Sequence, residues 1–133
     1  MARTVNTAPE EIEMTINKSK PALVVDPSTE IVSLLRRILT QMGFEEVDDA
    51  ADGSIALQKL AEKEYGLVTT AWHMQPMGGE EFVRQTTQTF PDIPVIVIAS
   101  DPAGGEEGIR LGAKGYIAKA FRAPEVRDMI NRL

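Results

Sequence analysis

Charged side chains stand at the ends of two short apolar runs in this chain. Asp26 follows the run Ala22–Val25, and Lys119 closes a later one. A third run, Leu67–Thr70, leads directly into Ala71. A carboxylate can ligate a hard cation and an ammonium can hold an anion, whereas the methyl group of Ala71 is neither a nucleophile nor a ligand. The side chains at the ends of these three segments therefore offer one carboxylate and one ammonium group for chemistry.

Composition bounds the class of protein. The chain has 133 residues, enough for one domain that buries roughly two thirds of its unfolded surface. Its net charge of -6 disfavours binding to nucleic acid or to an anionic membrane, since both require clustered Lys and Arg. It has no cysteine, which excludes disulfides and thiolate metal sites and is typical of a reducing cytoplasm. No apolar run approaches ~20 residues, so we expect no membrane span.

Short segments that predict strands alternate with helical patterns along the chain from Pro21 onward. The predicted strands are Ala22–Val25, Glu45–Ala50 around Val47, Leu67–Thr70, Val95–Ala99 and Gly115–Lys119. The segments that predict helices are Ile31–Met42 after a Ser28 cap, Ile55–Ala61 after an Asp52-Gly53 turn, a segment from Gly79, Ala103–Leu111, and Pro124–Leu133. Residues 1–20 are polar and predict a flexible N-terminal extension, in which Pro9–Ile12 could begin a short helix.

This alternation predicts an α/β fold, a doubly wound five-stranded parallel sheet with helices on both faces. In such a sheet the ligand crevice lies outside the carboxyl ends of the strands, at the point where strand order reverses. Asp26 and Ala71 follow the first and third strands and should meet there.

Three segments carry a resemblance to a known family. Asp26-Pro27, Trp72-His73-Met74 and Tyr116–Phe121 are similar in order and spacing to the landmarks of response-regulator receiver domains. The resemblance covers residues 21–133. It implies the flavodoxin-like strand order 2-1-3-4-5 and a role in bacterial two-component phosphorelay signalling. In that family an aspartate accepts a phosphoryl group with the help of Mg²⁺, a lysine and a Ser or Thr hydroxyl.

At most of the positions that match the family's functional residues, this chain lacks the side chain that the chemistry requires. Asp26 takes the place of the first acidic residue, but Pro27 takes the place of the second. Ala71 stands at the acceptor position, Ala99 at the hydroxyl position and Lys119 at the lysine position. Asp26 is then the one remaining metal ligand, so we expect no metal and no cofactor, with Mg²⁺ binding only if the acceptor aspartate is restored. Asp26 and Lys119 should pair across this relic of an active site.

Further positions bear on the alternatives. If the fourth strand ran one residue longer, Ser100 could supply the missing hydroxyl. Tyr116 falls at the family's aromatic switch position, and Trp72 should lie on the rim of the crevice, as a partner anchor or as a cover. The segment between Ala99 and Lys119 is about two residues shorter than is usual in the family and is rich in glycine. We therefore expect its helix to be short, late-starting or mobile.

Two functional hypotheses follow. The first is a receiver domain that cannot be phosphorylated, is not an enzyme, and binds a histidine kinase, a regulator, another receiver or a second copy of itself. The second is an ordinary phosphoryl-accepting receiver silenced by an engineered Asp-to-Ala change at Ala71. Pro27 and Ala99 favour natural degeneracy, because each removes a further part of the same chemistry. A flavin carrier or an enzyme on the same architecture is disfavoured, since Asp26 would repel a phosphate beside Ser28 and Thr29.

Overall fold

A five-stranded parallel sheet forms the centre of the molecule, with strand order β2-β1-β3-β4-β5. The computed structural model describes residues 16–133. The strands are β1 (Ala22–Val25), β2 (Val47–Ala50), β3 (Leu67–Ala71), β4 (Val95–Ala99) and β5 (Gly115–Ala118). The helices are α2 (Thr29–Gln41), α3 (Gly53–Glu62), α4 (Gly79–Thr89), α5 (Pro102–Arg110) and α6 (Ala123–Asn131). The predicted fold class and strand order are confirmed.

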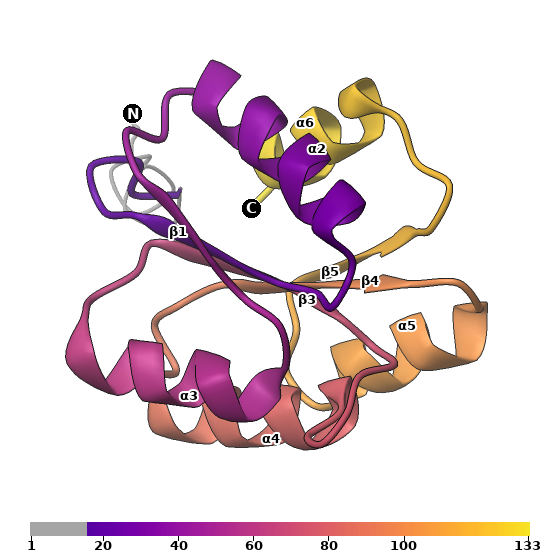
Figure 1. Cartoon of the computed structure of the whole chain (residues 1–133). Coiled ribbons are helices and arrows are strands. Elements are labelled where there is room, and N and C mark those ends of the chain that lie inside the picture. The colour runs from indigo at the N-terminus through magenta and orange to yellow at the C-terminus, as the bar shows by residue number, and fades with distance from the viewer. Residues whose placement is uncertain (1–15) are drawn as a thin grey trace, which may run out of the picture.

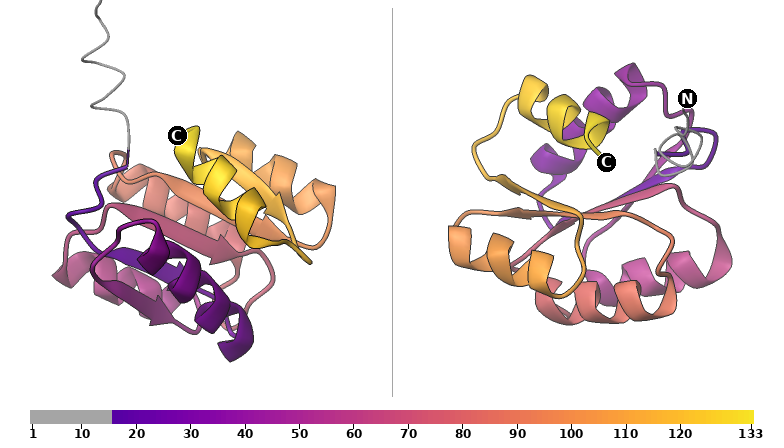
Figure 2. Two further views of the ribbon diagram at one scale, coloured as in Figure 1. Left: turned by 90° about the horizontal axis from the view of Figure 1, so that it is seen from above. Right: turned by 180° about the vertical axis from the view of Figure 1, so that it is seen from behind.

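The helices form a layer on each face of the sheet (Figures 1 and 2). Helices α2 and α6 cover one face, and α3, α4 and α5 cover the other. Successive residues of the central strands point to opposite faces, so each strand contributes to two apolar cores. Val24 and Ile96 pack under α2 and α6, while Leu23 and Val97 pack against the other layer. Strands β1, β3 and β4 are buried throughout, which explains why β1 and β4 read as unbroken apolar runs. In β3 the buried residues include Thr69 and Thr70.

Short polar side chains set where the helices begin. Ser28 caps α2, since its hydroxyl accepts a hydrogen bond from the Ile31 amide at 3.3 Å. The predicted Asp52-Gly53 turn proves to be the start of α3, with Asp52 as the N-cap and Gly53 as the first helical residue. Asp101 likewise caps α5, and Pro102 takes its first position, where a missing amide costs nothing. These three caps lie two or three residues beyond the ends of β1, β2 and β4, so the loops there are short.

Some predicted boundaries differ from the structure. β2 begins at Val47 rather than at Glu45, β3 includes Ala71, and β5 ends at Ala118. Of the alternatives for the helix before β5, the late start is wrong, because α5 begins at Pro102, three residues after the last residue of β4. The helix is short, with nine residues. The helix suggested for Pro9–Ile12 lies outside the described residues. Within residues 16–133, no helix is long and apolar enough to cross a membrane.

Candidate functional site

Four strand ends converge at the carboxyl edge of the sheet. Asp26 follows β1, Ala71 and Ala99 are the last residues of β3 and β4, and Lys119 follows β5. We call these four residues the carboxyl-edge site. The backbone fixes both charged residues, because the Asp26 amide donates to the Ala50 carbonyl at 2.9 Å and the Lys119 amide donates to the Ala99 carbonyl at 2.8 Å. The sequence-predicted residues are thus neighbours along one edge.

Asp26 is a buried carboxylate with a distant counter-charge. Its side chain is 2% exposed, and its Oδ2 lies 3.7 Å from Nζ of Lys119, whose side chain is 33% exposed. Its Oδ1 accepts a hydrogen bond from the Ser28 amide at 2.9 Å. Oδ2 finds no hydrogen-bond partner among residues 16–133, since 3.7 Å exceeds hydrogen-bonding range. The ammonium therefore neutralises the carboxylate by charge more than by a direct hydrogen bond.

The other two members of the site carry only methyl groups. Ala71 and Ala99 are almost completely buried. β4 ends at Ala99, and Ser100 beyond it is exposed, so the longer strand that would have brought its hydroxyl into the site does not form. Pro27 is exposed and has no side-chain oxygen. Among the described residues, no group of three or more His, Cys, Asp or Glu side chains is placed to hold a metal ion.

Trp72 is half-buried and packs against the core with part of its side chain. The indole joins the core beneath α3 and α4 and lies against α5, where a Cβ added at Gly104 would come within 2.7 Å of Cδ1. His73, the next residue, is 70% exposed in its side chain, with Nε2 3.9 Å from Oδ2 of Asp101. A shallow hollow of about 550 Å³ opens beside these two residues, and Gly78, Gly79 and Glu80 also line it.

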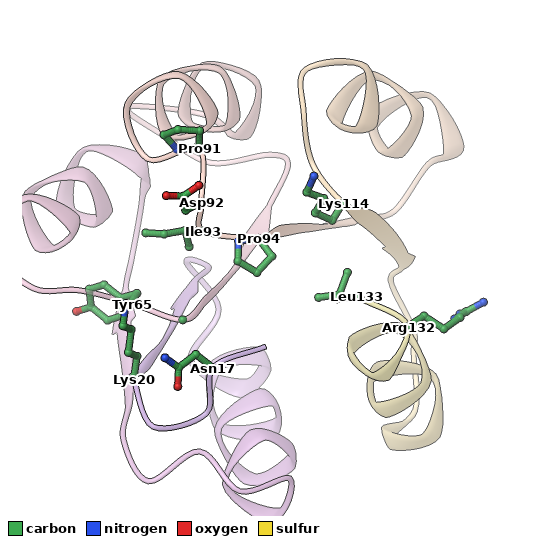
Figure 3. A pocket seen from close by; sticks show the side chains of 11 residues that line it. Asn17, Lys20, Tyr65, Pro91, Asp92, Ile93, Pro94, Lys114, Arg132 and Leu133 are labelled. Atoms are coloured by element: carbon green, nitrogen blue, oxygen red, sulfur yellow. The ribbon is translucent and has the colours of Figure 1, made fainter. Parts of the chain in front are cut away.

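A second hollow lies at the opposite, amino-terminal edge of the sheet (Figure 3). Its volume is about 510 Å³. Its lining comes from residues that precede strands and from the end of the chain, among them Lys20, Tyr65, Pro94, Lys114 and Arg132. In Figure 3 the charged ends of Lys114 and Arg132 point away from the middle of the hollow. Sequence reasoning missed this hollow, although residues that stand just before parallel strands must gather at one edge.

An acidic network lies beside β2, and its Tyr65 also lines the hollow at the amino-terminal edge. The Tyr65 hydroxyl donates to Oδ2 of Asp48 at 2.6 Å, and Nζ of Lys63 donates to the same oxygen at 2.9 Å and also binds Glu46. Burial raises the pKa of Asp48, but the hydrogen bonds from Tyr65 and Lys63 outweigh it and hold that pKa below its usual value. Burial, aided by the bond to Asp48, raises the pKa of Tyr65. These groups stabilise an edge strand and take no part in the carboxyl-edge site.

Comparison with known proteins decides the family. The profile of the response regulator receiver domain matches residues 22–131, most of the chain. The chain belongs to this family. Every strand and helix described above falls inside the matched range, and the carboxyl-edge site lies within it as well.

Relatives of this receiver domain include chemotaxis proteins. It is 25% identical over 126 residues to the chemotaxis protein CheY-3 of Vibrio cholerae, covering 92% of this chain and 97% of the relative. It is 28% identical over 116 residues to the chemotaxis protein CheY of Thermotoga maritima, covering 86% and 97%.

Solved structures of receiver domains share the same architecture. CheY4 of Vibrio cholerae superposes with a TM-score of 0.77 at 27% identity, covering 85% of this chain and 97% of that one. The CheY chain of a CheX-CheY-BeF3-Mg²⁺ complex from Borrelia burgdorferi superposes with a TM-score of 0.80 at 26% identity, covering 85% and 87%. This receiver domain is therefore CheY-like in fold over nearly its full described length.

Proposed function

We propose that this receiver domain takes part in two-component signalling as a protein-binding module that is not phosphorylated and is not an enzyme. The observation that carries the proposal is the methyl group of Ala71, buried at the end of β3 where the family resemblance puts the acceptor aspartate. A methyl group cannot form an acyl phosphate. The buried methyl of Ala99 and the exposed ring of Pro27 add to it, since neither supplies the oxygen that the family's chemistry uses.

Its partners in this proposal are signalling proteins of the cytoplasm: a histidine kinase, a regulator, another receiver or a second copy. The CheY relative from Borrelia burgdorferi was solved in a complex with CheX, which is a protein partner of a receiver domain. The net charge of -6 gives no support to nucleic acid or membrane as a partner.

The second candidate is a phosphoryl-accepting receiver whose acceptor was changed to Ala71. The retained ion pair favours it, because Asp26 and Lys119 stay 3.7 Å apart at the edge where both would serve the chemistry. The codon at position 71 in the natural gene separates an engineered change from a natural one.

The decisive experiment is incubation with acetyl phosphate and Mg²⁺, followed by intact mass spectrometry. Three proteins are compared: the chain itself, Ala71→Asp and the matched control Ala71→Asn, which is similar in shape to aspartate but cannot accept a phosphoryl group. We expect no added phosphoryl mass on any of them, because Pro27 and Ala99 remain. Labelling of Ala71→Asp alone would instead favour the silenced switch, and labelling of the unchanged chain would overturn the proposal.

A further inference from the structure

Helix α5 carries three glycines on its buried face. Gly104, Gly105 and Gly108 are all buried, although glycine is the weakest helix former apart from proline. We call these three residues the glycine seat. A nine-residue helix with this composition would hold together poorly by itself. Its stability must therefore come from what lies against the glycines.

Two aromatic rings and a valine fill the space that side chains would otherwise take. A Cβ at Gly105 would overlap the ring of Tyr116. A Cβ at Gly104 would come within 2.7 Å of Cδ1 of Trp72, and one at Gly108 within 2.6 Å of Cγ2 of Val97. Real Cβ atoms do not approach other atoms so closely, so even alanine does not fit without a shift of the rings or of α5. The backbone of α5 thus lies directly on side chains from β4, from β5 and from Trp72, the residue after β3.

Both ends of α5 are also tied down. At its start, Oδ1 of Asp101 accepts a hydrogen bond from the Gly104 amide at 2.8 Å. Just past its end, the Leu111 carbonyl accepts one from the Thr87 hydroxyl of α4 at 2.9 Å. The Ala113 amide in turn donates to the Gly108 carbonyl at 2.9 Å, which closes the helix. These bonds hold α5 at both ends as well as along the glycine seat.

We propose that the glycine seat is a conformational lock, in which the Trp72 and Tyr116 rings clamp α5 onto the sheet in one position. The exposed face of α5, where Ile109 is 49% exposed, is then held in one position relative to the sheet. The lock goes beyond the proposed function and depends on packing alone, whether or not the domain is phosphorylated. It predicts the opposite of the mobility expected from the glycines alone.

The test is a sign reversal in thermal stability. In an ordinary helix, Gly→Ala raises the melting temperature, because alanine has the higher helix propensity. We expect Gly105→Ala to lower the melting temperature by ~5 °C, since the new methyl overlaps the Tyr116 ring. In a Tyr116→Ala background, where the ring is gone, the same Gly105→Ala change should raise it. A rise in both backgrounds would overturn the proposal.

Hydrogen exchange then locates the effect. In the unchanged chain we expect amides of α5 to exchange as slowly as those of β4, because the clamped helix opens only when the whole domain unfolds. Tyr116→Ala should accelerate exchange in residues 102–110 and leave α6 unchanged, even if Gly105→Ala proves too unstable to purify. The control Ala103→Gly, on the exposed face of α5, should weaken the helix equally in the presence and absence of the Tyr116 ring. Fast exchange of α5 in the unchanged chain would refute the lock.

Discussion

At the scale of single residues, the ion pair of Asp26 and Lys119 should contribute to the free energy of unfolding, and this contribution can be tested. Removing the ammonium leaves a carboxylate that is 2% exposed without its counter-charge. Because Lys119 is one-third exposed and partly screened by solvent, we expect Lys119→Met to lower the free energy of unfolding by only about 1–2 kcal/mol in urea titrations. The double variant Asp26→Asn with Lys119→Met should recover most of that loss.

Controls for this pair are available in the chain. Lys114→Met changes an exposed lysine outside the carboxyl-edge site and should be close to neutral. If Lys119→Met were as neutral as Lys114→Met, the 3.7 Å contact would contribute nothing to folding.

A second residue-scale prediction concerns pH and the Tyr65–Asp48 bond. The pKa of Asp48 in the fold lies below its ordinary value, despite burial, because of Tyr65 and Lys63. Its stabilising contribution is therefore present above about pH 4, the value of a free Asp, and is lost as pH falls through the folded pKa. Tyr65→Phe should cost about 1 kcal/mol at pH 7 and less at low pH, because protonated Asp48 is a poorer acceptor.

The measurement is the urea midpoint of both proteins across acidic pH. Tyr116→Phe, on the edge strand at the far side of the sheet, serves as the control and should show a pH-independent difference. A Tyr65→Phe effect that stayed constant down to low pH would contradict the assignment.

At the scale of secondary-structure elements, α5 depends on its cap more than a helix with better formers would. Asp101→Ala removes the acceptor of the Gly104 amide and should lower the free energy of unfolding by about 1 kcal/mol. Asp101→Asn keeps an oxygen acceptor and should retain most of the stability. Urea titration of the three proteins checks this, and an Asn variant as unstable as the Ala variant would point to the carboxylate's charge instead, which lies near His73.

The same element shows what sequence could and could not predict. Strands β1 and β4 were predictable to the residue, because a strand buried on both faces leaves an unbroken apolar run. The packing of the glycine seat was not predictable, since helix propensity considers each residue by itself. The rings that explain Gly104 and Gly105 come from Trp72 and Tyr116, on other elements. The members of the carboxyl-edge site were predictable because parallel strands end at a common edge, but their distances depended on the full fold.

At the scale of the whole molecule, the scarcity of carboxylates at the carboxyl edge predicts how the fold responds to a divalent cation. A ligand that binds the native state raises the melting temperature, and one that does not bind leaves it unchanged. We expect the melting temperature of this chain in millimolar Mg²⁺ to equal its melting temperature in NaCl of the same ionic strength. Ala71→Asp should gain a Mg²⁺-dependent increase that Ala71→Asn lacks. A Mg²⁺-specific increase in the melting temperature of the unchanged chain would contradict this expectation, because it would reveal a cation site.

The two edges of the sheet also determine on which side of the molecule an attached segment would lie. Asn17 and Leu133 line the same hollow at the amino edge, and strands of four or five residues, roughly 13–17 Å long, separate that hollow from the carboxyl-edge site. A tether, a tag or a neighbouring domain joined at either of these positions would leave from the side opposite Asp26 and Ala71. Fused into a longer polypeptide or immobilised on a surface through Leu133, the domain would keep the carboxyl edge of its sheet facing away from the attachment.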